Sequence, residues 1–77
     1  MHVNTGVKTY VQSIIFDRKI YTLSNARGWL KLHGYEPIKQ PHTTEHYHRY
    51  RIRKPDKNDN YITKDLRNGI KLIILQH

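Results

Sequence analysis

The stretch "YITKDLRNGIKLIILQH", residues 61–77, contains two runs rich in apolar residues that meet at the dipeptide Asn68-Gly69. Such runs on either side of an Asn-Gly pair are typical of a β-hairpin. Neighbouring side chains in a strand point to opposite faces, so a shift of one residue in the pairing would exchange the two faces. The length of the turn therefore determines which side chains of this hairpin face the core.

Cross-strand pairing selects between two possible turn lengths. A two-residue turn would place Leu66 opposite Lys71 and would set charges against apolar side chains along the whole hairpin. A three-residue loop pairs Leu66 with Ile70 and Asp65 with Lys71, so that apolar side chains meet and an acid meets a base. We predict the three-residue loop, in which Gly69 supplies the positive φ that a bulged turn requires.

The stretch "HYHRYRIR", residues 46–53, alternates with the period of a second strand. One face of that strand carries His48, Tyr50 and Ile52, and the other carries Tyr47, Arg49, Arg51 and Arg53. We expect the first set to join the core. The second set would present three guanidinium groups in a row on the opposite face.

Residues 21–37, "YTLSNARGWLKLHGYEP", predict the only helix. Helical spacing places Trp29 on one side together with Leu23, Ala26, Leu30 and His33. Thr22 or Ser24 can cap the start of the helix, and Gly34 can adopt the left-handed conformation that ends it. We expect Trp29 to anchor this helix in the core.

The remaining segments complete the predicted layout. Residues 10–16 are apolar on both faces, which indicates a central strand, whereas two prolines in residues 36–41 favour an edge strand. Residues 42–45 read as a turn, residues 54–60 as a polar loop and residues 1–9 as a flexible N-terminal arm. The sequence thus predicts a single α+β domain over residues 10–77, with one helix packed on one face of a small, mostly antiparallel sheet of four to five strands in the order β-α-β-β-β-β.

Composition limits the possible partners. Fourteen Lys and Arg against six Asp and Glu give a net charge of +8 over 77 residues, and there is no Cys. No apolar run is long enough to span a membrane and the N-terminus lacks the order of a signal peptide, so we expect a soluble intracellular protein with no membrane partner. An excess of positive charge favours nucleic acid as the partner, with an acidic protein surface as the alternative.

The row of arginines is the strongest candidate site. Arginine binds phosphate in a bidentate manner and tyrosine can stack on bases, so we expect Arg49, Arg51, Arg53 and Tyr47 to bind nucleic acid. Three lysines could extend the site: Lys54, Lys64 and Lys71. The alternative is a solvated face whose cations pair with acids on neighbouring strands.

Catalysis, metal binding and cofactor binding have weak support. The acids are scattered singly along the chain, so no carboxylate pair is indicated: Asp17, Glu36, Glu45, Asp56, Asp59 and Asp65. His42, His46 and His48 lie close in sequence, but the Cys pairs of structural zinc sites are missing. We expect no enzymatic activity, no metal site and no cofactor.

The helix motif Ala-x-x-Trp-Leu-x-x-His-Gly-Tyr, the strand motif Tyr-x-Arg-Tyr-Arg and the Gly-Ile-Lys hairpin resemble a small domain found in large double-stranded DNA viruses and in tailed phages. The matching positions are Ala26, Trp29, Leu30, His33, Gly34, Tyr35, Tyr47, Arg49, Tyr50, Arg51, Gly69 and Ile70. The resemblance implies a viral setting, either inside the infected host cell (cytoplasm or nucleus) or in the virion, and it implies no activity.

Two functions follow from these observations. The first is a small viral accessory protein that binds nucleic acid without sequence specificity. The second is a virion or assembly protein that docks on an acidic viral protein or associates with itself as a homo-oligomer. The small core, which supplies only about 3–5 kcal/mol in a chain of this length, favours a stabilising partner in either case.

Overall fold

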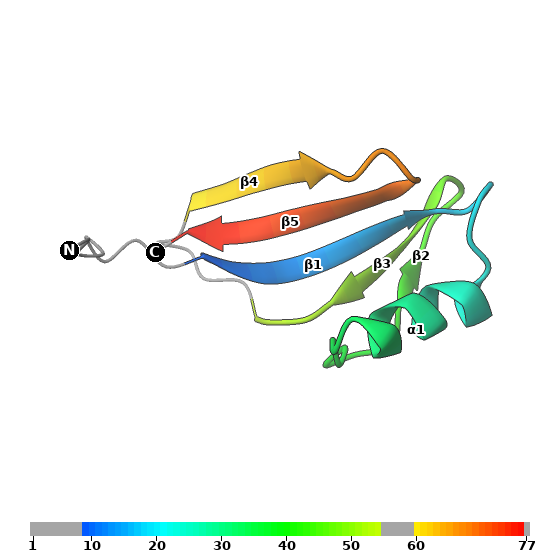
Figure 1. Ribbon diagram of the computed structural model, residues 1–77, viewed down its shortest axis with the longest axis horizontal. Coiled ribbons are helices and arrows are strands. Elements are labelled where there is room, and N and C mark those ends of the chain that lie inside the picture. The colour runs from blue at the N-terminus through cyan, green and yellow to red at the C-terminus, as the bar shows by residue number, and fades with distance from the viewer. Residues whose placement is uncertain (1–8, 55–59, 77) are drawn as a thin grey trace.

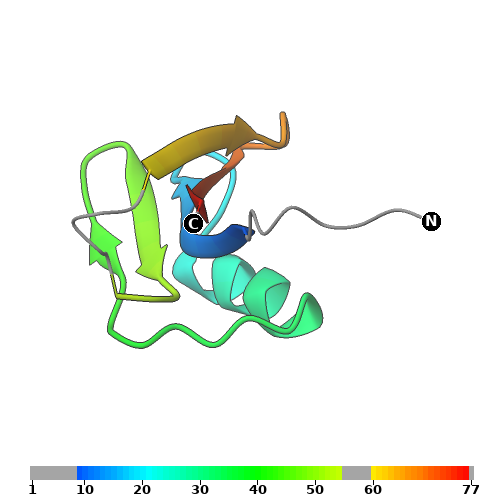
Figure 2. The same cartoon turned by 90° about the vertical axis from the view of Figure 1, so that its left-hand side faces the viewer.

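The computed structural model describes residues 9–54 and 60–76. The elements follow one another as β1 (Thr9–Asp17), α1 (Leu23–Leu32), β2 (His42–Thr43), β3 (Tyr47–Arg51), β4 (Asn60–Asp65) and β5 (Ile70–Gln76). The strands form one antiparallel sheet in the order β2-β3-β1-β5-β4. Because α1 lies against one face of this sheet (Figure 1; Figure 2), the predicted α+β class, its element order and the central position of β1 are confirmed.

The core lies between α1 and the neighbouring strands. Its buried side chains are Ile14, Phe16, Ala26, Leu30, Tyr50 and Ile70. The ring of Phe16 meets three other rings edge-on, with centroid distances of 5.1 Å to Tyr21, 5.7 Å to Trp29 and 5.7 Å to Tyr50. Edge-to-face pairs of this kind add to the free energy gained by burying the rings.

The helix begins and ends where the sequence predicts. The Thr22 hydroxyl accepts a hydrogen bond from the amide of Asn25 at 3.1 Å, and Gly34 takes a φ of +79° just past the C-terminus. The predicted apolar side is narrower than expected, however. Ala26 and Leu30 are buried and Trp29 is partly buried, whereas Leu23 and His33 are exposed. His33 stacks on the outer face of Trp29 with ring centroids 3.9 Å apart.

The hairpin of β4 and β5 has the predicted register. Asp65 pairs with Lys71, the amide of Leu66 donates to the carbonyl of Ile70 at 2.9 Å, and Gly69 has a φ of +80°. The loop also holds Arg67 at a φ of +68°, which the sequence did not indicate. The Asp65 carboxylate accepts a hydrogen bond from the amide of Arg67 at 2.7 Å and so stabilises the positive φ of that residue.

Two predictions for the segment before β3 are wrong. Residues 36–41 are irregular, and β2 instead occupies residues that were expected to form a turn. Pro37 and Pro41 cannot donate to a ladder, and the segment is held beside β3 by a bond from the Ile38 amide to the Arg51 carbonyl at 2.9 Å. A strand therefore resumes only at His42, after the second proline.

The predicted strand at residues 46–53 is shorter in the structure, because the ladder becomes irregular beyond Arg51. The amides of Ile52 and Arg53 both donate to the carbonyl of Gln12, at 2.8 Å and 3.1 Å. The register between β1 and β5 also shifts at this point, between Val11 and Ser13. Such a bulge bends the sheet and changes the direction of the side chains that follow.

The predicted arm lies outside the described residues except for Thr9, which begins β1. Of the predicted polar loop, residues 55–59 lie outside the described part, and Asn60 begins β4. Within the described part of the chain, no helix has the length and apolarity required to cross a membrane.

Candidate nucleic-acid interface

The basic face is the face of the sheet opposite α1, and it carries Tyr47, Arg49, Arg51 and Lys71. The strand register defines it: Ile14 and Tyr50 pair with each other and are buried in the core, so Arg49 and Arg51 on either side of Tyr50 point away from α1. Burial follows the same alternation, since His48 and Tyr50 are buried while Tyr47, Arg49 and Arg51 are half-buried. The predicted division of this strand into two faces is therefore confirmed.

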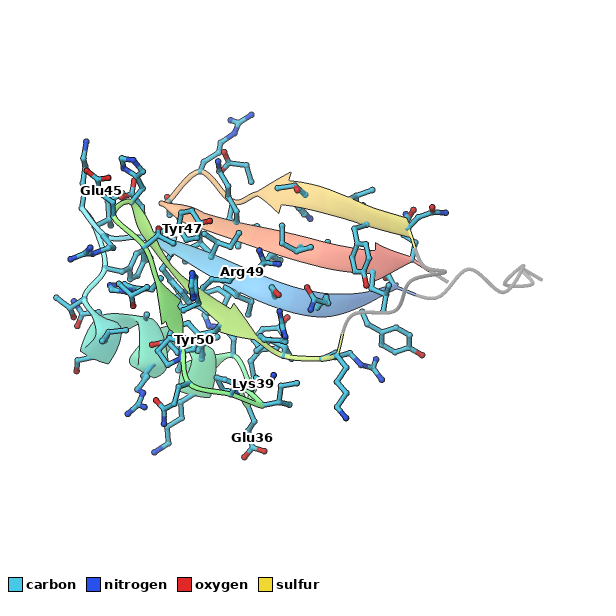
Figure 3. All side chains as sticks on the ribbon, turned by 180° about the vertical axis from the view of Figure 1, so that it is seen from behind. Glu36, Lys39, Glu45, Tyr47, Arg49 and Tyr50 are labelled. Atoms are coloured by element: carbon cyan, nitrogen blue, oxygen red, sulfur yellow. The ribbon has the colours of Figure 1, made fainter. Side chains whose placement is uncertain are left out.

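Arg49 and Arg51 line a hollow of about 460 Å³ at the β2 side of the basic face. The other described residues that line it are Lys39, Gln40, Pro41 and His42, so its described lining contains three cations and no acid. Register places His42 directly beside Arg49. Figure 3, which shows the molecule from behind, has Tyr47 and Arg49 along β3 and Lys39 on the segment beside it.

Neighbouring strands leave the charge of these two arginines uncompensated. On β1, Arg49 pairs with Ile15 and Arg51 pairs with Ser13, and neither partner is charged. The Nε atom of Arg49 is buried, and no group of the described residues accepts a hydrogen bond from it.

The acids of the basic face lie at its other end. Asp65 pairs with Lys71 across the hairpin, and Asp17 pairs with Tyr47 at the end of β1. Both carboxylates already accept bonds from turn amides, that of Asp17 from Lys19 at 2.9 Å and that of Asp65 from Arg67 at 2.7 Å. Lys71 is thus balanced by Asp65, and the excess of positive charge lies at the β2 side.

Arg53 and Lys54 lie beyond the end of β3 and outside the hollow. The guanidinium carbon of Arg53 sits 4.0 Å above the centre of the Tyr10 ring, a cation–π contact that draws it toward β1. Lys54 follows it and is exposed. The expected row of three guanidinium groups is therefore a pair, Arg49 and Arg51, with Arg53 set apart.

Lys64 does not belong to the basic face. It pairs with Leu72, and Leu72 pairs with Ile14, whose side chain is buried beneath α1. Because paired residues point to the same side of a sheet, Lys64 lies on the α1 side. The predicted hairpin register already placed Lys64 and Lys71 on opposite faces, and the pairing of β5 with β1 decides which of the two lies on the α1 side.

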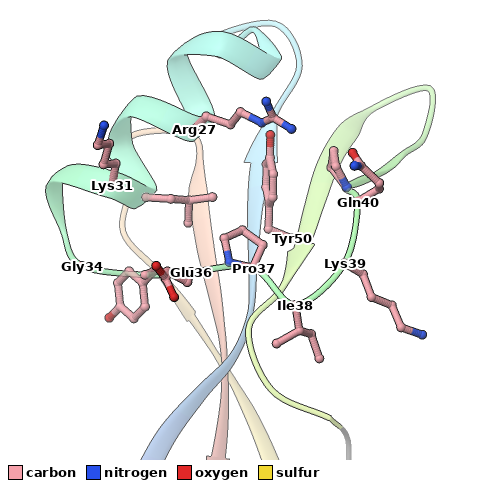
Figure 4. A pocket seen from close by; sticks show the side chains of 12 residues that line it. Arg27, Lys31, Gly34, Glu36, Pro37, Ile38, Lys39, Gln40 and Tyr50 are labelled. Atoms are coloured by element: carbon pink, nitrogen blue, oxygen red, sulfur yellow. The ribbon is translucent and has the colours of Figure 1, made fainter.

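A hollow larger than the one at Arg49 lies between α1 and residues 36–41, with a volume of about 960 Å³ (Figure 4). Burial raises the pKa of the Tyr50 hydroxyl in its wall above the ordinary value, and the neighbouring Arg27 offsets part of that rise. Lys31 and Lys39 point away from this hollow in Figure 4, and Glu36 is one of its lining residues. Although this hollow is the larger of the two, an acid lines it, so we do not choose it as the anion site.

Lys39 and His42 are the members of the site that sequence reasoning missed. They come from the segment expected to form an edge strand and from the turn expected after it. The two prolines that flank Lys39 were a signal that the segment is irregular, but not that it lies beside Arg49. For metal binding, residues 9–54 and 60–76 contain no group of three potential ligands. His48 is buried and its Nδ1 lies 2.9 Å from the Thr43 hydroxyl.

Comparisons of the chain with models of protein families, with curated proteins and with solved structures found no match.

Proposed function

We propose that this protein binds nucleic acid without sequence preference, through the hollow on its basic face. Among the described residues, three cations and one histidine line that hollow and no acid does, and this single observation carries the proposal. Arg49, Arg51 and Lys39 would contact phosphate oxygens. A guanidinium group can donate two parallel hydrogen bonds to one phosphate, which suits Arg49 and Arg51 to this role.

The chemistry of the site favours the sugar–phosphate backbone over the bases. Phosphate contacts position a nucleic acid without reporting its sequence, and the described part of the site is a half-buried strand face rather than an element shaped to enter a groove. Tyr47 could add a stacking contact at the edge of the site. Arg53, Lys54 and Lys71 would act at longer range, because they lie outside the hollow.

The proposal includes the role of a non-catalytic accessory protein of a DNA virus, acting in the infected cell or the virion. That setting rests on the resemblance of the helix, strand and hairpin motifs. The phosphate-binding role rests on the geometry of the hollow and does not depend on the setting.

The test is the salt dependence of binding, measured by fluorescence anisotropy with single-stranded and duplex probes. Removing one cation that neutralises a phosphate should make the slope of log K against log salt shallower by about 0.9 on duplex DNA. The double variant Arg49→Gln/Arg51→Gln should therefore reduce the slope by about 2. It should keep its fold, because both side chains point away from the core.

The matched control is Lys31→Gln/Lys64→Gln, which removes the same charge from the α1 side of the molecule. Its slope should stay close to that of the wild type. If both double variants lower affinity equally, only the net charge matters and the hollow is not the site. If the wild type binds neither probe at low salt, the nucleic-acid proposal fails, and docking on an acidic protein becomes the better proposal.

A further inference from the structure

The two edges of the sheet differ in how well they are protected. The β2 edge has only two residues and follows Pro41, and short strands and prolines are common means of preventing edge pairing. The β4 edge has six residues, all of them exposed, with no proline and an uninterrupted register against β5. Among the described residues, no strand pairs with the outer side of β4.

The direction of the backbone groups in β4 follows from two hydrogen bonds. The Leu66 amide bonds to Ile70 on β5, and the Gly69 carbonyl accepts from Asp17 on β1. In an antiparallel ladder the bonded pairs alternate, so Lys64 and Ile62 use their backbone groups toward β5. Thr63, between them, must direct its amide and its carbonyl outward.

From these features we infer that a second copy of this chain pairs with β4 through its own β4, antiparallel, with the two-fold axis at Thr63. The β4 strands of the two copies then pair with each other, because the amide of each Thr63 donates to the carbonyl of the other. Ile62 lies opposite Lys64 of the second copy, and Tyr61 lies opposite Asp65 of the second copy. No like charges meet, whereas an axis at Lys64 would set two lysines against each other.

Charge and apolar surface favour the same edge. The chain carries +8 and copies repel one another over most of the surface, but β4 contains one Lys and one Asp. Ile62 is 45% exposed and continues a row with Ile74 and Val11, as the strand pairing shows. β4 extends beyond α1 (Figure 1), and pairing at this edge would place Ile62 against Lys64 of the second copy.

The contact is small, so the dimer should be weak. Interfaces below about 1,200 Å² belong to transient complexes, and we expect a dissociation constant of about 1–100 µM. Sedimentation equilibrium of the full chain, freed of nucleic acid, should show a monomer–dimer equilibrium over that range. Because the contact is made by backbone and apolar groups, raising the salt concentration should not dissociate it.

Two variants with matched controls test the edge itself. Thr63→Pro removes the outward donor without touching the bonds to β5, and it should raise the dissociation constant about tenfold or more. Thr63→Val keeps the amide and should leave the dissociation constant unchanged. Ile62→Lys sets two lysines opposite each other at both ends of the pairing and should weaken the dimer. Its control is Ile38→Lys, which adds the same charge at a similarly exposed isoleucine away from β4 and should leave the dimer unchanged.

Circular dichroism of each variant identifies any loss of fold. If Thr63→Pro unfolds, the comparison of Ile62→Lys with Ile38→Lys tests whether the dimer forms through β4. A wild type that remains monomeric at about 0.5 mM overturns the inference. So does a dimer that neither Thr63→Pro nor Ile62→Lys weakens, because it must then form through another surface. The inference does not rest on the proposed function, since neither Ile62 nor Thr63 lines the hollow on the basic face.

Discussion

At the scale of single residues, Phe16 has the strongest effect on the core. It is fully buried, and three aromatic rings meet it edge-on. Phe16→Ala should cost about 3–5 kcal/mol, which equals the whole stability expected for a domain of this size. We therefore expect that variant to be unfolded at 37 °C.

Trp29→Ala should cost less than Phe16→Ala, because Trp29 is only partly buried and its outer face is covered by the exposed ring of His33. Circular dichroism of both variants at 37 °C, and urea unfolding of Trp29→Ala beside the milder variant Phe16→Leu, measure the order. A Trp29→Ala variant less stable than Phe16→Ala would show that the tryptophan, not the phenylalanine, anchors the core.

Gly69 gives a second prediction at this scale. Its φ of +80° disfavours side chains, and a Cβ there would approach the Cδ1 atom of Ile20 to 2.6 Å. Gly69→Val should cost about 1–2 kcal/mol and Gly69→Asn less, since Asn tolerates the left-handed region. Thermal melts in the Ile20→Ala background separate the two causes, because truncating Ile20 removes the contact and leaves the backbone strain. If Ile20→Ala fully rescues Gly69→Val, strain at φ contributes nothing.

At the scale of elements, β3 is a regular strand only as far as Arg51. Arg49 and Arg51 line the hollow, whereas Arg53 lies on the ring of Tyr10. Arg53→Gln should therefore reduce the salt slope of duplex binding by clearly less than the roughly 0.9 expected for Arg49→Gln. Anisotropy titrations of the single variants test this, and equal changes would mean that the three arginines act as one row.

At the scale of the whole molecule, unbalanced charge opposes the compact state. Within residues 9–54 and 60–76 there are twelve Lys and Arg against four Asp and Glu, and such self-repulsion is weakened by salt. The melting temperature should rise when ionic strength increases from about 0.01 M to 0.1 M, as the Debye length falls from about 30 Å to 10 Å. Scanning calorimetry should show a smaller rise for Arg49→Gln/Arg51→Gln. A melting temperature that falls with salt would indicate that ion pairs dominate instead.

Features that depend on residues close together in the chain could be predicted from the amino-acid pattern alone. The hairpin register followed from pairing Leu66 with Ile70 and Asp65 with Lys71, because a wrong turn length would have set charges against apolar side chains. The ends of α1 followed from Thr22 and Gly34, whose effects on the backbone are local. The two faces of β3 followed from the period of two in a strand.

Contacts between segments far apart in the chain could not be predicted in this way. The bulge at Gln12 lies where β1 pairs with β3 on one side and with β5 on the other. Arg53 lies beyond this bulge, apart from the other two arginines. Lys39 reaches the hollow because its irregular segment is held to Arg51 by the Ile38 amide. The pairing of Leu72 with Ile14 decides that Lys64, and not Lys71, lies on the α1 side. These positions depend on contacts between residues far apart in the chain, and local patterns of charge and hydrophobicity contain no information about such contacts.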